Sequence, residues 1–340
     1  MYSIRLFSLA IISLVLLAAC SQQPLEKEHY LSGRTMGTTY NVKFVSDKPI
    51  DTVALQHKID QRLIQINQLM STYIGDSELS LFNRAPGQQP FTLSPETALV
   101  VAEAIRLGEM SGHALDVTIG PLVNLWGFGP TKRPETIPSD GQIADAKALS
   151  GLDKLTLEGM VLTKTIDNLY LDLSTIAKGY GVDAIAELLI DYQLTSFLVE
   201  IGGEMRVAGI KLNGESWRIA IEKPVSESRA VQKIISVGDN AVATSGDYRN
   251  YFEEDGIRYS HLIDPISGYP IQHNTVSATV VHASSMTADG LATAMMILSA
   301  KDAQALAEEQ GIALMLILKE GNTFVEYQSP AFTQMVTIIN

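Results

Sequence analysis

Cysteine is nearly absent from this 340-residue sequence, since Cys20 is the only one. A single cysteine excludes disulfide frameworks, paired-cysteine redox motifs and cysteine-ligated zinc. Paired-histidine motifs such as HExxH are also missing, so a zinc hydrolase is not expected and any metal would have oxygen or imidazole ligands. Neither the Walker phosphate loop nor the glycine pattern of Rossmann nucleotide-binding folds occurs. The sequence therefore lacks the common signatures of redox, zinc and nucleotide-binding proteins.

Positive charge is also scarce, because the sequence has 25 Lys and Arg residues but 38 Asp and Glu residues, which gives a formal net charge of −13. A protein that binds nucleic acid needs a basic surface to neutralise phosphates, so we expect no nucleic-acid partner. With 46% hydrophobic and 19% charged residues, the composition is typical of a globular protein. No internal repeat or Pro/Ser/Gly-rich linker interrupts residues 31–340, which favours a single large unit over two domains.

The unbroken apolar or small-residue run at the N-terminus, from Leu6 to Ala19, is too short for the ~20 residues of a spanning helix. It follows Arg5 and is typical of a secretory signal peptide. It ends in a Leu-Ala-Ala-Cys sequence at 17–20 that is similar to the lipobox of bacterial lipoproteins, in which the cysteine, here Cys20, is diacylated. We therefore predict a signal peptide at 1–19, a lipidated Cys20 with a tether at 20–30, and a folded domain at 31–340. The alternative is an ordinary signal peptide with an incidental cysteine.

Hydrophobic periodicity predicts alternating helices and strands. Residues 39–45 alternate as a strand does, and apolar residues from Leu55 to Met70 recur at helical spacing after a capping Asp51. Ser94 and Pro95 predict the N-cap and first residue of a helix that ends near Gly112. Further helices are expected at 143–149, 176–192, 286–298 and 302–309. Further strands are expected at 155–157, 169–173, 197–201, 217–221, 233–237, 259–263, 276–281 and 312–318. Because short turns separate most strands, we predict an α+β fold with mainly antiparallel pairing.

Two segments have residue patterns that suit an anion and a metal ion. At the predicted junction of strand 169–173 with the next helix, backbone N–H groups and Lys178 suit an anion. A Ser or Thr N-cap with a solvated lysine explains the same pattern. Asp289 and Thr293 are four residues apart on one helical face, and their oxygens suit Mg²⁺ shared with phosphate oxygens. An aspartate in a first helical turn is, however, also favoured by the helix dipole alone.

Four further segments are candidates for binding or catalysis. Asp116 lies in a turn where it could bind a ligand or cap the turn itself. His261 could accept a proton from a hydroxyl as a general base, although most single histidines in strands have no such role. The Gly202-Gly203 pair would allow close approach of a ligand, or would form a bulge. The small and hydroxyl residues at 36–40 are explained by the turn that enters a strand.

Taken together, these segments resemble the FAD:protein FMN transferases, the ApbE-type flavin transferases, over about residues 31–335. Several long motifs in register carry the resemblance, which is why it is more specific than any one of them. They are MGTTY at 36–40, ALDVTIGPLVNLWGFG at 114–129, DLSTIAKGYGVD at 172–183, EIGGEMRVAG at 200–209, ATSGDYRNYF at 243–252, HLIDPISGYPI at 261–271 and TADGLAT at 287–293.

The resemblance implies a single α+β domain related to the T-fold, with Mg²⁺ as cofactor and FAD as donor substrate. The flavin-contacting positions of the family fall on Met36, Tyr73, Ala114, Leu115, Asp116, Asp172, Lys178 and Ile263. Its metal positions fall on Thr175, through the main-chain carbonyl, and on Asp289 and Thr293. Some relatives have an additional acidic residue where this chain has Ala292, which leaves the number of protein ligands open.

The implied reaction transfers FMN from FAD to a Ser or Thr hydroxyl of an acceptor protein and releases AMP, with His261 as the base. The family implies acceptors among flavin-carrying subunits of membrane complexes, such as sodium-pumping NADH:quinone reductase and Rnf-type complexes. A lipid anchor would then place the enzyme on the periplasmic side of the bacterial inner membrane. Two alternatives are a metal-dependent FAD pyrophosphatase that releases FMN and AMP, and a lipid-anchored flavin carrier without enzymatic activity.

Overall fold

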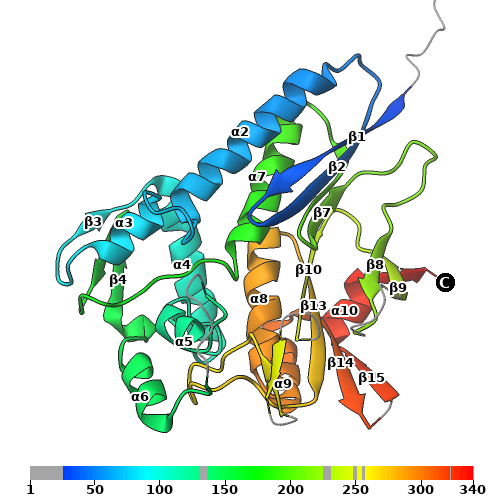
Figure 1. Ribbon diagram of the computed structural model, residues 1–340. Coiled ribbons are helices and arrows are strands. Elements are labelled where there is room, and N and C mark those ends of the chain that lie inside the picture. Colours follow the sequence, from blue (N-terminus) through cyan, green and yellow to red (C-terminus); the bar gives the residue numbers. More distant parts are fainter. Residues whose placement is uncertain are drawn as a thin grey trace, which may run out of the picture.

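The computed structural model describes residues 26–129, 136–224, 231–247, 251–254, 257–321 and 323–339 (Figure 1). Its centre is a sheet of eight strands in the order β1-β2-β6-β7-β10-β13-β14-β15, and all of the neighbouring pairs are antiparallel. These strands are β1 (Lys27–Thr35), β2 (Thr38–Ser46), β6 (Ser196–Ile201), β7 (Glu204–Ala208), β10 (Ala241–Gly246), β13 (Thr275–His282), β14 (Ala313–Glu320) and β15 (Thr323–Gln328). The predicted α+β class with a mainly antiparallel sheet is confirmed.

Three smaller sheets accompany the central one, in the orders β16-β9-β8, β3-β5-β4 and β11-β12. Their strands are β3 (Phe91–Thr92), β4 (Leu155–Glu158), β5 (Val161–Lys164), β8 (Ile219–Glu222), β9 (Val231–Ser236), β11 (Tyr251–Glu254), β12 (Ile257–Ser260) and β16 (Thr337–Ile339). The helices are α2 (Thr52–Met70), α3 (Glu78–Arg84), α4 (Pro95–Met110), α5 (Gly120–Leu125), α6 (Asp140–Ala148), α7 (Ala177–Asp191), α8 (Ser285–Ile297), α9 (Ala300–Gln310) and α10 (Pro330–Met335), with a 3-10 turn at Leu152–Lys154.

The two faces of the central sheet are covered by different layers. Helices α7 and α8 pack on one face, and α2 lies across α7 and β1 (Figure 1). The opposite face buries Trp217 and Ile219 of the β8 region together with Phe332 of α10. Both faces are therefore apolar, and the helical face carries the ends of α7 and α8 from which the candidate site is built.

Most predicted helices begin and end within a few residues of the expected positions. Asp51 caps α2 by accepting hydrogen bonds from the N–H groups of Val53 and Ala54, and Ser94 caps α4 with Pro95 as its first residue. The side chains of these caps satisfy N–H groups that would otherwise lack a partner in the first helical turn. The capping prediction is confirmed at both helices.

The N-terminal boundary of the domain differs from the prediction. Strand β1 begins at Lys27 and pairs with β2 along its whole length, from the Lys27–Ser46 pair to the Thr35–Thr38 pair. Residues 27–30, expected to be part of a tether, therefore belong to the sheet. Charged residues in this stretch obscured the strand, because an edge strand has few apolar positions to mark it. The predicted signal peptide and Cys20 lie outside the described residues.

The predicted strand at 169–173 is wrong, because the segment joins none of the described sheets. Tyr170 forms an isolated bridge to Ile119, and the Asp172 N–H donates to the Val117 carbonyl. The backbone of Leu171 is held by the side-chain amide of Asn83. Asn83 Nδ2 donates to the Leu171 carbonyl over 2.9 Å, and its Oδ1 accepts from the Leu171 N–H over 2.8 Å. One amide thus replaces a neighbouring strand, an interaction that no periodicity pattern reports. The predicted strand at 259–263 likewise ends at Ser260.

Replacing Asn83 with alanine should destabilise the chain by about 2–4 kcal/mol, because the buried N–H and C=O of Leu171 both lose their partner. The free energy of unfolding from urea titration measures this loss. Asn83→Asp keeps the acceptor but sets a carboxylate oxygen against the Leu171 carbonyl, so it should also be destabilised. Equal stability of Asn83→Ala and the wild type would show that the amide does not hold this segment.

In the part of the chain that the structure describes, we find no helix with the length and apolar content needed to cross a bilayer.

Candidate active site

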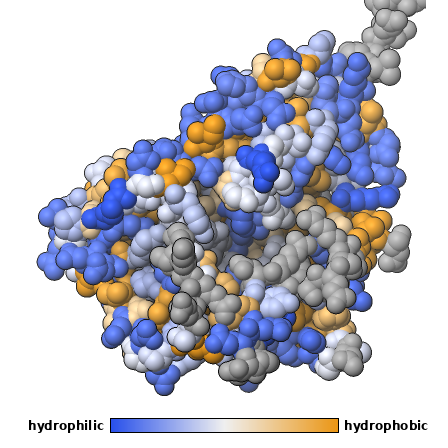
Figure 2. All heavy atoms as spheres, viewed as in Figure 1, coloured by the Kyte–Doolittle hydropathy of each residue, from blue (hydrophilic) through white to orange (hydrophobic). Residues whose placement is uncertain are grey.

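A cavity of about 410 Å³ brings most of the predicted site residues together. Its walls include Thr175, Asp289 and Thr293, the three predicted metal positions, and His261, the predicted base. Figure 2 shows the surface hollowed near the centre of the view, in the region of α7 and α8 in Figure 1. Predicted flavin-contacting residues that also line it are Tyr73, Leu115, Asp116, Asp172, Lys178 and Ile263. Segments far apart in the sequence therefore meet at one cavity.

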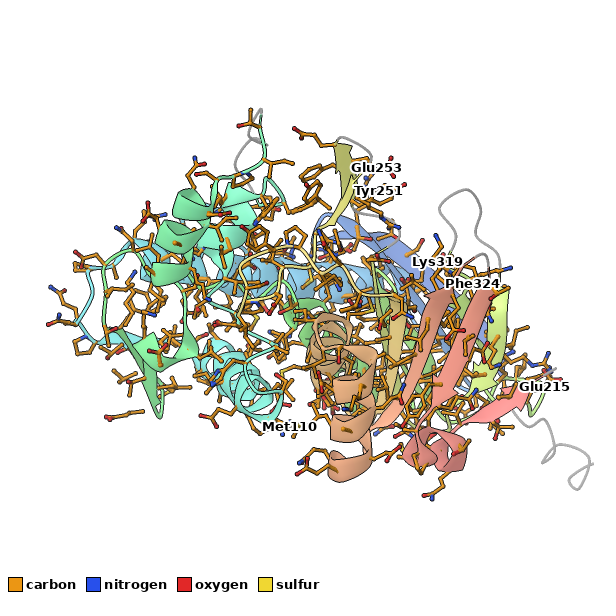
Figure 3. All side chains as sticks on the ribbon, turned by 90° about the horizontal axis from the view of Figure 1, so that it is seen from below. Met110, Glu215, Tyr251, Glu253, Lys319 and Phe324 are labelled. Carbon is orange, nitrogen blue, oxygen red and sulfur yellow. The ribbon has the colours of Figure 1, made fainter. Side chains whose placement is uncertain are left out.

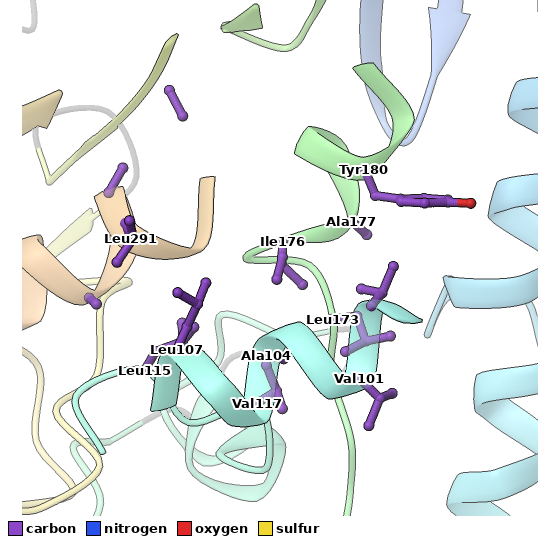
Figure 4. Close-up of a cluster of buried hydrophobic side chains, with 14 of the residues drawn as sticks. Val101, Ala104, Leu107, Leu115, Val117, Leu173, Ile176, Ala177, Tyr180 and Leu291 are labelled. Carbon is purple, nitrogen blue, oxygen red and sulfur yellow. The ribbon is translucent and has the colours of Figure 1, made fainter. Parts of the chain in front are cut away.

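The cavity residues are positioned by their apolar sequence neighbours. Leu115, Leu173, Ile176 and Leu291 belong to one buried cluster between α4, α7 and α8, and all are almost fully buried (Figure 4). Each of these apolar residues is within two positions of a cavity residue, as Ile176 is of Thr175. Packing of the cluster therefore determines where the polar groups of the neighbouring positions emerge.

Lys178 is the positive centre of a buried charge cluster. Its Nζ lies 2.8 Å from Oε1 of Glu204 and 3.5 Å from Oδ1 of Asp289. Burial alone would lower the pKa of Lys178, but the charges of Asp289 and Glu204 outweigh it and raise that pKa. Burial raises the pKa of Asp289, although the Lys178 charge opposes the shift. The alternative interpretation, a Ser or Thr N-cap with a solvated lysine, is wrong, since Ile176 occupies the N-cap position without a side-chain hydrogen bond and Lys178 is paired with two carboxylates.

Asp289 faces the start of α7 from the second turn of α8. Its Oδ2 accepts a hydrogen bond from the Gly179 N–H over 2.9 Å. A Cβ on Gly179 would lie 2.3 Å from the carbonyl oxygen of Ser285, so only glycine permits this close approach of the two helices. The first turn of α8 contains no acidic residue, so the helix dipole does not account for Asp289.

The donor set at the cavity fits a magnesium ion. In the part of the chain that the structure describes, the buried hydroxyl oxygen of Thr175 and the buried Oε2 of Glu204 have no hydrogen-bond partner. Carboxylate and hydroxyl oxygens of Asp289 and Thr293 line the same space. Within the described residues no group of three or more Asp, Glu, His or Cys side chains could hold a metal alone. Magnesium commonly takes one or two carboxylates and completes its octahedron with substrate phosphates and water, so these residues suit it when phosphate is present.

The two other carboxylates of the cavity also organise turns. Oδ1 of Asp116 accepts from the N–H of Thr118 over 2.7 Å and from its hydroxyl over 2.6 Å. Burial raises the pKa of Asp116, and the hydrogen bonds from Thr118 oppose this. Asp172 Oδ1 accepts from the Ser174 N–H over 2.9 Å. The capping interpretation of Asp116 is therefore confirmed, and the residue borders the cavity as well.

His261 follows the end of β12 and lies against aromatic residues. Its ring centroid is 6.3 Å from that of Phe128 in an edge-on arrangement. Nearby, the fully buried Trp126 donates from Nε1 to the Gly268 carbonyl over 2.9 Å, which connects the end of α5 to the turn after His261. This contact holds the histidine-bearing loop against the wall of the cavity.

Two predicted flavin-contacting residues do not line the cavity. Ala114 is buried beside Leu115, and Met36, with φ of 48°, lies in the β1–β2 turn where its Cε approaches Gly181. Their proposed contacts with flavin stay a prediction. Tyr73, by contrast, lines the cavity with 72% of its surface exposed, so it stands at the rim.

The sequence patterns missed Glu204 and the end of β10, where Thr244, Ser245 and Gly246 line the cavity. Gly202 and Gly203, with φ of 62° and 112°, form the two-residue turn between β6 and β7, rather than a bulge. This turn leaves Glu204 opposite the buried Ile201. The positive φ values at both turn positions are typical of a tight hairpin and explain the glycine pair.

Without metal, the contribution of Glu204 to the stability of the chain should fall as pH rises from about 4.5 to 7. Burial, opposed by the Lys178 charge and reinforced by Asp289, raises the pKa of Glu204 from 4.5 to about 7. In this window the folded state binds more protons than the unfolded state, so stability decreases by at most ~1.4 kcal/mol per pH unit for one group. Urea unfolding in EDTA measures the slope, which should flatten in Glu204→Gln. The same slope in both proteins would contradict the assignment.

Comparison with known proteins identifies the family. The ApbE family model matches residues 36–316. The chain belongs to the ApbE family. A relative from Vibrio cholerae serotype O1 named FAD:protein FMN transferase is 51% identical to this chain over 329 residues. The match covers 96% of this chain and 98% of the relative. A relative of the same name from Haemophilus influenzae is 47% identical and covers 94% of both chains.

Solved ApbE structures show the same fold. The flavin transferase ApbE from Vibrio cholerae superposes with a TM-score of 0.86 at 49% identity, covering 91% of this chain and 99% of that one. The apo form of the flavinyl transferase ApbE from Pseudomonas stutzeri gives a TM-score of 0.85 at 41% identity, over 91% and 97% of the two chains. These matches confirm both the resemblance read from the motifs and the ApbE-like fold.

Proposed function

We propose that this chain transfers FMN from FAD to a Ser or Thr hydroxyl of an acceptor protein and releases AMP. The observation that carries the proposal is the single cavity that joins Asp289, Thr293 and Thr175 to His261. Relatives at 51% and 47% identity that share the name FAD:protein FMN transferase support it.

In this reaction the acceptor hydroxyl oxygen bonds to the FMN phosphorus, and the bond from that phosphorus to the AMP phosphate oxygen breaks. His261 accepts the hydroxyl proton as general base, since a neutral imidazole can do so near pH 7. Lys178 supplies positive charge toward the diphosphate, and the Leu115 and Ile263 side chains provide apolar wall for the flavin. The electron pair of the broken bond leaves on AMP.

Asp289, Thr293 and Thr175 would hold Mg²⁺. When bound, the ion neutralises charge on the phosphate oxygens, which an acidic protein needs in order to bind and cleave a diphosphate. The buried, unpartnered hydroxyl of Thr175 favours a contribution from its side chain, in addition to the predicted main-chain carbonyl.

A flavinylation assay tests the proposal. The soluble 21–340 fragment is incubated with FAD, Mg²⁺ and the flavin-carrying subunit of a sodium-pumping NADH:quinone reductase, and a denaturing gel is viewed under flavin fluorescence. A fluorescent acceptor band together with released AMP is the expected result. AMP without a band would indicate hydrolysis of FAD instead, and unchanged FAD would indicate a carrier.

We further propose that lipid on Cys20 holds the enzyme at the periplasmic side of the inner membrane, beside acceptors of the sodium-pumping NADH:quinone reductase or Rnf type. The lipobox-like sequence at 17–20 supports this proposal. Labelling cells with a palmitate analogue should label the wild type, while Cys20→Ala should abolish the label and release the protein from membranes. An unchanged label in Cys20→Ala would contradict lipidation at this residue.

A further inference from the structure

A second cavity, of about 420 Å³, borders the catalytic one through the same two chain segments. Gly246 and His261 line the catalytic cavity, whereas their sequence neighbours Asp247 and Ser260 line the second. Adjacent residues at the ends of β10 and β12 therefore line different cavities, so these two segments form a wall between them. A molecule held in the second cavity would therefore lie close to the base His261.

Three polar atoms around this second cavity are buried and have no hydrogen-bond partner among the described residues. They are Oδ1 of Asp247, Nε of Arg258 and Nε2 of His273, and all three residues line the cavity. Buried polar atoms in folded proteins nearly always have a partner, so such a concentration at one cavity needs an explanation. None of the three contributes to the flavin or metal site.

The surrounding contacts fix which of these atoms donate and which accept. The guanidinium of Arg258 stacks 3.9 Å from the Tyr251 ring, donates from one terminal nitrogen to the Asp247 carbonyl and lies 3.7 Å from Oδ2 of Asp247. Its Nε–H has no partner among the described residues. Nδ1 of His273 accepts from the Thr275 N–H over 3.3 Å, which places the proton of the neutral ring on Nε2. The site thus offers two donors next to one carboxylate acceptor, Asp247.

Positive charge dominates the entrance. Lys319, an exposed residue of β14, also lines the cavity, so Arg258 and Lys319 together outnumber the one carboxylate. Figure 3 shows Lys319 and Tyr251, the residue on which Arg258 stacks, both toward the upper part of the view. In a chain of net charge −13, this local excess of cations favours an anionic ligand.

We infer that the second cavity binds a carboxylate side chain of the acceptor protein, a few residues from the hydroxyl that is modified. The carboxylate accepts from Arg258 and His273, and an adjacent peptide N–H of the acceptor donates to Asp247. Free phosphate offers the same anionic oxygens but no donor for Oδ1 of Asp247, whose Oδ2 already pairs with Arg258. A peptide satisfies both kinds of atom, which is why the acceptor is favoured. This inference rests on the proposed function, because that function supplies the acceptor.

The test measures binding of the same acceptor subunit as in the flavinylation assay, by biolayer interferometry without FAD. Arg258→Gln should raise the Kd for the acceptor about tenfold or more, because a charge-assisted contact is lost. Arg84→Gln removes the same charge from an exposed position of α3 and should leave the Kd unchanged. His273→Ala should raise the Kd for the acceptor in the same way. It replaces Arg258→Gln in the test if Arg258→Gln does not fold. The KM for FAD should stay unchanged in both.

On the acceptor side, each Asp or Glu near the modified hydroxyl is changed to its amide. One of these changes should weaken binding to the wild type about tenfold, and should have no further effect on Arg258→Gln. Equal Kd values for wild type and Arg258→Gln, or absence of acceptor binding by the wild type, would overturn the inference. The inference would also be overturned if inorganic phosphate raised the melting temperature of the wild type but not that of Arg258→Gln, since the ligand would then be a free anion. Arg258-dependent binding without FMN transfer would contradict only the proposed function.

Discussion

Replacing Asp289 with alanine should reduce Mg²⁺-dependent turnover of FAD about 10³-fold or more. The variant loses the only carboxylate of the proposed metal-binding set, and an electrostatic contact of this kind typically supplies several kcal/mol of transition-state stabilisation. The measurement is AMP release at saturating FAD over a range of Mg²⁺ concentrations. We expect the Mg²⁺ dependence itself to disappear.

Asp289 also has structural contacts, so its replacement needs a matched control. Its carboxylate accepts from the Gly179 N–H and pairs with Lys178, and both contacts are lost in the alanine variant. Asp289→Asn retains an oxygen for Gly179 and isolates the loss of charge. Asp145→Asn, on the exposed side of α6, removes the same charge far from the cavity set and should keep full activity. Normal Mg²⁺-dependent turnover in Asp289→Asn would exclude this residue as a metal ligand.

Replacing His261 with alanine should slow transfer of FMN to the acceptor about 10²- to 10⁴-fold, the range typical for removal of a general base. The affinity for FAD should change much less, since leucine, isoleucine and tyrosine side chains line the cavity as well. Single-turnover transfer at saturating FAD and acceptor measures the rate. Equilibrium titration with FAD measures the affinity of the same variant.

The rate of FMN transfer to the acceptor shows whether His261 acts as a base or has a structural role. His261→Gln keeps hydrogen-bonding capacity but cannot hold the proton near neutral pH, so it should be as slow as the alanine variant. A structural role would instead be rescued by glutamine. Equal rates of FAD cleavage in the wild type and the alanine variant would remove His261 from the mechanism.

The sequence predicted those site residues that lie in distinctive local patterns. Asp289 and Thr293 were found from their spacing on one helical face, and the cavity confirms that they share it. Lys178 was found at a strand-to-helix junction. Its partners could not be found in that way, because Glu204 is 26 residues away and approaches only through the sheet.

Glu204 was detectable in principle. Phe197, Val199 and Ile201 alternate as buried residues of β6, and a two-residue glycine turn keeps Glu204 on the same face as Ile201. If a two-residue hairpin turn had been assumed at the glycine pair, Glu204 would have been predicted to be buried. The glycine pair was instead interpreted as a bulge or a ligand contact, which leaves the register across the turn undefined.

Local hydrophobic patterns predicted neither the hydrogen-bond partner of Leu171 nor the full length of β1. The chain at 169–173 has the alternation of a strand, yet the Asn83 side chain supplies both backbone hydrogen bonds of Leu171. Strand β1 has a charged beginning because it lies at the edge of the sheet. The contact at Leu171 is made by a residue 88 positions away, so it is set by tertiary structure, whereas β1 depends on its hairpin partner β2.

The early start of β1 limits where the proposed anchored enzyme can work. Only residues 21–26 separate Cys20 from Lys27, and a chain of this length reaches ~25 Å when fully extended. The nine residues of β1 add ~30 Å before the chain turns at Met36, beside the helix that carries Lys178. The β1–β2 turn would thus lie within ~55 Å of the bilayer surface, which confines this enzyme to substrates held at the membrane or brought to it.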